Sequence, residues 1–185
     1  MEPPGDNRCY RERNTADRIG HRLPDFRTGC LDAESRHSYR RRTSVEPNNG
    51  RRLATLEMMR EEIIPNSPFT AFLGTEISTC ADGEAELVVP IRKDLTQHHG
   101  FAHGAVVGCV ADNACAWAAA SVVGDVVTTE YKLHLLAPAV GEKLIGRGRV
   151  IKSSSRLVIA AADVFTATGG KEKQVATMLA TIMPI

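Results

Sequence analysis

The sequence predicts an α+β fold in which one long central helix is wrapped by a curved antiparallel sheet of about six strands. Two observations carry this prediction. A single apolar stretch, residues 105–123, has the length of one helix of about 28 Å. The segments around it alternate between apolar and polar residues and are separated by turn residues. One long helix needs one curved sheet to cover it.

Composition limits the function classes. The chain has 185 residues, of which 43% are hydrophobic, which suits one domain with a real core. Residues 1–52 hold 12 Arg against 8 acidic residues, and residues 53–185 hold 11 Lys and Arg against 14 acidic residues. A mildly acidic folded part makes nucleic acid an unexpected partner. The five cysteines form no CxxC pair, which favours a reducing compartment and a cytoplasmic location.

Residues 1–52 are predicted to be a disordered basic extension, and residues 53–185 to be the folded domain. The extension has no hydrophobic run and no helical or strand periodicity. Its acidic residues are untypical of a transit peptide, and it has no secretory apolar region. The cluster Arg40-Arg41-Arg42 could contact RNA or an acidic surface, but a solvated tail is the favoured interpretation.

The elements follow in order along the chain. Residues 53–64 predict a short helix that packs through Leu53, Leu56, Met59 or Arg60, and Ile63, and that Pro65 ends. Residues 71–78 and 84–89 predict a hairpin around Asp82-Gly83. After the long apolar helix of residues 105–123, strands are predicted at 126–136, 143–152, 156–166 and 174–183. In the first of these, Val127, Thr129, Tyr131, Leu133 and Leu135 share one face. The last two strands are apolar on both faces and should be central in the sheet.

A membrane span is the alternative explanation of the apolar stretch. It is rich in Ala rather than Leu, it carries Asp112 and Asn113, and it stands alone among amphipathic strands. The sequence therefore favours a core helix and no membrane partner.

The loop before this helix and one acid within it carry the chemistry. Gly100 and Gly104 flank His103, so backbone amides at a helix start can approach an oxyanion or a polarised carbonyl. Between Leu95 and Gly124 there is no Lys, Arg or Glu, and the only Asp is Asp112. A carboxylate in such surroundings must be paired, hydrogen-bonded or used in chemistry.

The spacing of the two features predicts a site shared between subunits. Gly104 and Asp112 are eight residues apart, which is about 12 Å along a helix, whereas a general base must lie about 3 Å from its water. We therefore expect a homodimer in which Gly104 of one subunit meets Asp112 of the other.

The chain resembles the PaaI-like, phenylacetate-pathway type of hotdog-fold acyl-CoA thioesterase from about Ile63 to its end. Three segments carry the resemblance: the loop Gln97-His98-His99-Gly100-Phe101-Ala102-His103-Gly104-Ala105, the pair Asp112-Asn113, and the strand from Thr128 to Pro138. Gln97 stands where this family usually has Asn, and Ala105 replaces a second Gly. Neither difference removes the helix-start amide or the acid.

The resemblance implies roles for these residues. The Gly104 amide and the Gln97 side chain would polarise a thioester carbonyl, and His103 would shape the loop. Asp112 of the facing subunit would activate water or attack directly through an anhydride, and Thr128 would hold the water. The other implied substrate contacts are His99, Gly100 and Asn113, and, for the CoA phosphates, Ser154, Ser155 and Arg156, with Arg147, Arg149 and Lys152 as further cations. No cofactor is implied, and dimers of this type often pair into homotetramers.

Other interpretations remain open at this point. Asp112 could be a structural carboxylate, and Thr128 could be present only as a good strand former. His98, His99 and His103 lack the further ligands of a recognisable metal site, so no metal is expected. For the whole domain, the alternative is a non-catalytic hotdog module that binds acyl-CoA or serves in assembly. Hydratase chemistry usually needs an Asp and a His together, and His103 is nine residues from Asp112.

Overall fold

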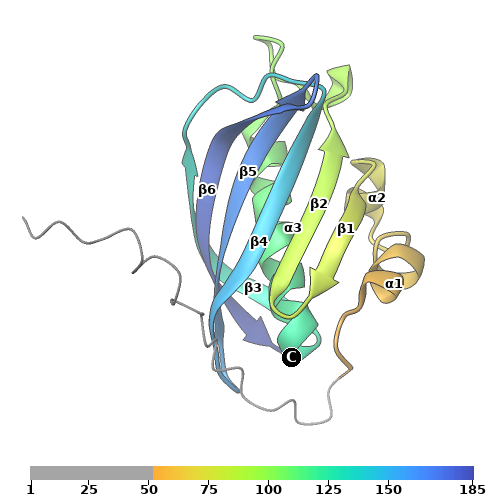
Figure 1. Ribbon diagram of the computed structural model, residues 1–185, viewed down its shortest axis with the longest axis vertical. Helices are drawn as coiled ribbons and strands as arrows, with labels where there is room; N and C mark the ends of the chain where they lie inside the picture. Colours follow the sequence, from red (N-terminus) through yellow and green to blue (C-terminus); the bar gives the residue numbers. More distant parts are fainter. Residues whose placement is uncertain (1–51) are drawn as a thin grey trace, which may run out of the picture. The chain divides into compact units, whose positions relative to one another are not determined.

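A six-stranded antiparallel sheet wraps around one long helix in the computed structural model, which describes residues 52–185 (Figure 1). Residues 1–51 lie outside the described part, so the predicted extension is not tested. The helix α3 spans Gly104–Val123. The strands are β1 (Glu76–Ala81), β2 (Glu84–Pro90), β3 (Val126–Leu135), β4 (Lys143–Ser153), β5 (Val158–Thr168) and β6 (Lys171–Pro184). The predicted fold class is confirmed.

The strand order is β1-β2-β4-β5-β6-β3, and all neighbouring strands are antiparallel. β5 and β6 are interior strands, as their apolar faces predicted. Asp82 and Gly83, with φ of 52° and 81°, form the tight turn of the β1-β2 hairpin. Gly169 and Gly170 turn β5 into β6 in the same left-handed region of backbone conformation.

Small residues let the sheet lie directly on the helix. A Cβ on Gly146 would lie 2.7 Å from Cγ1 of Val110, and a Cβ on Gly148 would overlap the carbonyl oxygen of Ala114. β4 therefore touches the helix backbone, and Ala114 and its neighbours are buried because nothing larger fits. This packing explains why the helix is rich in Ala. α3 is long and apolar enough to cross a membrane, but 72% of that stretch is buried inside the fold.

Two expectations about the N-terminal part are wrong. The predicted helix forms as α1 (Leu56–Met58) followed by the π-helix η2 (Met59–Ile63), whose wider turn leaves Ile63 exposed while Met59 is buried. The predicted strand at 71–78 begins only at Glu76. Its first part is the helix α2 (Pro68–Phe72), which starts with Pro68 at its first position. A 3₁₀ turn, η3 (Lys93–Leu95), follows β2.

The two edges of the sheet differ. α1 and η2 pack beside β1, and the Arg60 guanidinium donates two hydrogen bonds, of 3.1 and 2.9 Å, to the carbonyl oxygen of Ile77 (Figure 1). β3 forms the opposite edge. Within residues 52–185 it pairs only with β6, and no strand or helix covers its other side. The sheet therefore has one open edge, ten residues long.

An irregularity in β3 decides which of its side chains face the helix. The register with β6 shifts between Thr128 and Glu130, so Thr129 is an extra residue. Thr128 pairs with the buried Ile182 and faces α3, whereas Val127 pairs with Met183 on the other face. The predicted grouping of Val127 and Thr129 with Tyr131 is therefore wrong, and the shift turns Thr128 inward.

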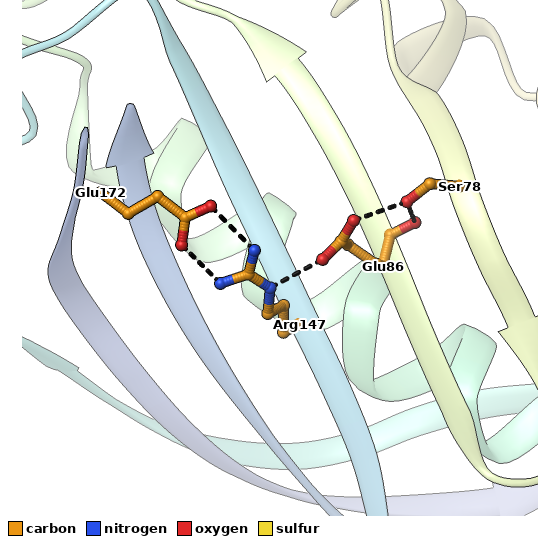
Figure 2. Close-up of polar contacts among 4 residues, drawn as sticks. All are labelled: Ser78, Glu86, Arg147 and Glu172. Carbon is orange, nitrogen blue, oxygen red and sulfur yellow. Dashed lines mark hydrogen bonds and ion pairs between the residues drawn. The ribbon is translucent and has the colours of Figure 1, made fainter. Parts of the chain in front are cut away.

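A polar clamp crosses the outer face of the sheet, away from α3 (Figure 2). We use the name outer clamp for Ser78, Glu86, Arg147, Phe165 and Glu172. Arg147 on β4 contacts Glu86 on β2 at 2.7 Å and Glu172 on β6 through bonds of 2.6 and 2.9 Å. Its guanidinium lies over the Phe165 ring of β5, and Ser78 of β1 donates to Glu86. These hydrogen bonds to Arg147 hold the pKa of both carboxyl groups below their usual value. The outer clamp thus links five strands.

Candidate active site at the start and middle of α3

The loop before α3 is a tight turn in which the side-chain oxygen of Gln97 accepts a hydrogen bond and its side-chain nitrogen donates none within residues 52–185. The Gln97 amide donates to the Phe101 carbonyl at 3.0 Å, and the Gly100 amide donates to the Gln97 carbonyl at 2.8 Å. Gly100 has φ of 84°, which favours glycine there. Oε1 of Gln97 accepts the amide of His99 at 2.9 Å. The side-chain nitrogen of Gln97 remains as a donor for a ligand.

One backbone amide at the start of α3 has no acceptor. His103 is the N-cap: its Nδ1 accepts the Ala105 amide at 3.0 Å, and its carbonyl accepts the Val106 and Val107 amides at 2.9 and 3.2 Å. Among the described residues, none accepts the amide of Gly104. This amide is therefore a free donor at the positive end of a 20-residue helix.

The cap also fixes which nitrogen of the neutral His103 ring carries the hydrogen. Because Nδ1 accepts a hydrogen bond, the ring proton of the neutral form is on Nε2. His103 is exposed, so Nε2–H is a second donor beside the Gly104 amide. The predicted loop-shaping role of His103 agrees with this contact, which orders the first turn of the helix.

Asp112 lies in the middle of α3, on the side that faces β3, and it is half-buried rather than fully buried. Thr128 Oγ1 donates to Asp112 Oδ1 at 2.7 Å. None of the five ion pairs given for residues 52–185 includes this carboxylate. The adjacent Asn113 donates to the Cys109 sulfur at 3.7 Å. The carboxylate is thus held by one hydroxyl, which leaves Oδ2 for a water or a substrate.

Gly104 and Asp112 lie on one side of the helix, along β3. A Cβ on Gly104 would lie 3.3 Å from Cδ1 of Leu135, and a Cβ on Gly108 would lie 3.5 Å from Cδ2 of Leu133. Thr128 occupies the corresponding position over Asp112. The helix start therefore faces one end of β3, and Asp112 faces the other end. The spacing of Gly104 and Asp112 predicted that the two groups are too far apart to meet within one chain. The structure keeps them apart in this way.

The predicted CoA contacts lie at the Asp112 end of the sheet. Val158, which follows the turn of Ser154, Ser155 and Arg156, pairs with Ile182, and Ile182 pairs with Thr128. Ser155 and Arg156 are exposed, whereas the Ser154 hydroxyl donates to the Leu157 carbonyl within its own turn. His99 and Gly100 are exposed at the opposite end, near Gly104.

Two cations suggested for the CoA phosphates are already engaged. Arg147 belongs to the outer clamp, and Arg149 pairs with Asp163 at 3.0 Å. Both alternate with Gly146 and Gly148, which face the helix, so they lie on the far side of the sheet from Asp112. Their assignment to CoA stays an untested prediction, and the exposed Arg156, at the Asp112 end, is the better placed cation.

The Cys109 thiol, one turn before Asp112, is not a suitable nucleophile. Burial, with a smaller effect of the Asp112 charge, raises its pKa to about 11, so the thiol is protonated at neutral pH. Within residues 52–185, no group of three His, Cys, Asp or Glu side chains is placed to hold a metal ion.

Sequence reasoning missed Leu133 and Leu135 as neighbours of the site. Strand alternation placed them on one face, but only the packing of β3 against Gly104 and Gly108 shows that this face lies beside the helix start. No local signal in the sequence distinguishes these leucines from other strand residues.

Comparison with known proteins decides the family. The family model of the thioesterase superfamily matches residues 99–173. A Halobacterium salinarum protein named as an esterase is 31% identical over 104 residues, which cover 52% of this chain and 68% of that protein. The chain belongs to the thioesterase superfamily. This thioesterase-type chain is also 37% identical to a thioesterase family protein from Silicibacter pomeroyi, whose crystal structure matches with a TM-score of 0.66 over 69% of this chain and 96% of that one.

The hotdog fold of this thioesterase is shared with proteins of phenylacetic acid degradation. A mutant of PaaI from Thermus thermophilus is 27% identical and matches with a TM-score of 0.58, over 64% of this chain and 100% of that one. The predicted resemblance to hotdog-type thioesterases is confirmed, and membership indicates thioester hydrolysis as the general activity. The matched residues 99–173 include Gly104, Asp112 and Thr128.

Proposed function

We propose that this protein hydrolyses an acyl-CoA thioester to the free acid and CoA, in a site that two subunits of a homodimer form together. The contact between Thr128 Oγ1 and Asp112 Oδ1, at 2.7 Å, carries the proposal, because it holds in place a half-buried carboxylate that belongs to none of the ion pairs given for residues 52–185. Membership of the thioesterase superfamily adds the reaction class.

The open edge of β3 supports the dimer. Along this strand, Val127 and Tyr131 are 41% and 50% exposed, which is high for large apolar side chains. A long uncovered edge strand is a ready template for pairing with a second copy. Antiparallel pairing of two β3 strands about a two-fold axis reverses their ends. The helix start of one subunit then lies beside Asp112 of the partner subunit, which is the arrangement that the spacing requires.

The reaction needs few groups. The Gly104 amide and the Gln97 side-chain amide donate to the thioester oxygen and stabilise the charge that develops on it. Asp112 of the partner subunit accepts a proton from a water molecule, whose oxygen attacks the carbonyl carbon. The tetrahedral intermediate collapses, the carbon–sulfur bond breaks, and CoA leaves as a thiolate that takes up a proton from solvent or from Asp112. Direct attack by Asp112, through an anhydride that water then cleaves, uses the same atoms.

The turn between β4 and β5 would bind the CoA part of the substrate. Arg156 and Ser155 are exposed there, at the Asp112 end of the sheet, where they can meet phosphate oxygens. We further propose that dimers pair into a homotetramer in the cytoplasm, through outer sheet faces that carry the exposed Leu179 and Met183.

A thiol-release assay tests the function. Acyl-CoAs with short, medium, long and aryl acyl groups are incubated with a thiol reagent and with the wild-type protein, Asp112→Asn, Asp112→Ala or Asp125→Asn as a control. Asp125 is an exposed acid just beyond α3. We expect turnover with the wild type and the control only. Turnover that survives both Asp112 substitutions would refute the role of Asp112. If no acyl-CoA is cleaved, the protein is instead a binding or assembly module.

A further inference from the structure

Leu135 is the large apolar side chain that lies against the start of α3. It is the last residue of β3, and its Cδ1 is 3.3 Å from the place where a Cβ on Gly104 would be. Even so, 58% of Leu135 is exposed, because nothing else in residues 52–185 covers it. The next inward residue, Leu133, lies over Gly108 and packs against the core. Leu135 is therefore the part of this face that a ligand can reach.

The position of the free Gly104 amide indicates which part of a bound thioester lies beside Leu135. A carbonyl oxygen bound to the Gly104 amide lies about 2.9 Å from its nitrogen, and the carbonyl carbon is about 1.2 Å further. The carbons that follow the carbonyl then come within van der Waals reach of Leu135, whose Cδ1 lies 3.3 Å from the place where a Cβ on Gly104 would be. Leu135 offers this part of the ligand an apolar surface and no hydrogen bond.

Charge around the helix start agrees with an apolar ligand. From Leu95 to Gly124 the chain has no Lys or Arg. The nearest cation along β3 is Lys132, which pairs with Leu179 on the outer face of the sheet. A carboxylate on the acyl group would therefore lose water and gain no Lys or Arg partner from these segments, which is unfavourable.

We propose that Leu135 is a specificity-determining residue that contacts the first carbons of the acyl group. The site then prefers acyl groups that are uncharged and unbranched next to the carbonyl, and it discriminates against dicarboxylic ones such as malonyl or succinyl. The inference rests on the proposed thioester hydrolysis and adds the class of acyl group to it.

The test compares three acyl-CoAs with four forms of the full-length protein. kcat and KM are measured for butyryl-CoA, isobutyryl-CoA and succinyl-CoA with the wild type, Leu135→Ala, Leu135→Met and Leu136→Ala. Leu136 is a matched control, because it is 55% exposed and none of its atoms lies within 4 Å of the place where a Cβ on Gly104 or Gly108 would be. Leu135→Met keeps the volume and serves if the alanine variant fails to fold.

We expect the wild type to prefer butyryl-CoA to both other substrates. Leu135→Ala should raise the isobutyryl to butyryl ratio of kcat/KM by about tenfold, Leu135→Met should change it less, and Leu136→Ala should leave it unchanged. Sedimentation of each variant shows whether the dimer persists. If the isobutyryl to butyryl ratio of kcat/KM is the same in the Leu135 variants and in the control, while butyryl-CoA is still cleaved, the inference is overturned and the proposed function is not. If the wild type cleaves no thioester, the proposed function fails and the inference with it.

Discussion

Replacing Gly104 with proline isolates the one amide that the mechanism assigns to the thioester oxygen. Gly104 is the first residue of α3, a position that proline favours because its missing N–H has no helical partner. The preceding His103 has φ of −62° and ψ of 140°, which a residue before proline readily adopts. The Ala105, Val106 and Val107 amides keep their bonds to His103. The substitution thus removes one donor and breaks no hydrogen bond of the fold.

The expected effect is that of losing one oxyanion donor, which is about a 100- to 1,000-fold fall in kcat. Gly104→Ala is the matched control: it adds a Cβ at the same place, 3.3 Å from Leu135, but keeps the N–H. Both variants should keep a melting temperature close to that of the wild type. The assay is thiol release from the best acyl-CoA at saturating concentration. Equal kcat for Gly104→Pro and Gly104→Ala would refute the role of this amide.

Three further predictions concern the rest of the molecule. Thr128→Val should lower kcat by about 10- to 100-fold, the worth of a hydrogen bond to a charged group, while Thr128→Ser keeps most activity; an equal loss in both would contradict this. Arg147 holds the pKa of Glu86 and Glu172 low, so its stabilisation is present above their usual pKa and is lost as pH falls below about 4.5. The melting temperature of the wild type should therefore fall more steeply in acid than that of Glu172→Gln; parallel curves would exclude the outer clamp as the cause. Gly148→Ala should lower the unfolding free energy by about 3 kcal/mol or more, because its Cβ would overlap the helix backbone; wild-type stability in urea would argue against this packing.

The fold was predictable because hydropathy patterns record which residues are buried. The apolar run of α3 favoured a core helix over a membrane span, and the two-sided apolar pattern of β5 and β6 favoured interior strands. The structure has a central helix and two interior strands at these positions. Local backbone features were not predictable from the same patterns. The π-helical turns of η2 rotated Ile63 outward, and the extra residue Thr129 turned Thr128 toward the helix. Such features depend on how an element packs and not on its own periodicity.

The site was predictable where the signal was chemical. Asp112 in an apolar helix and the glycines around His103 were unusual for their surroundings, so they could be identified before their contacts were known. Arg147 was an equally visible cation, but its engagement by Glu86 and Glu172 depends on residues far away in the chain. Leu135 gave no signal, because its proximity to Gly104 arises from the packing of β3 on α3.

Mixing two inactive variants tests most directly whether one site takes Gly104 and Asp112 from different subunits. Asp112→Asn keeps the helix-start amide, and Gly104→Pro keeps the carboxylate, so each homodimer has two damaged sites. A mixed dimer has one intact site if the groups come from different subunits. After unfolding and refolding an equal mixture, random pairing should restore about a quarter of wild-type activity. Activity that stays at the level of the separate variants, with mixed dimers confirmed by mass spectrometry, would contradict the shared site.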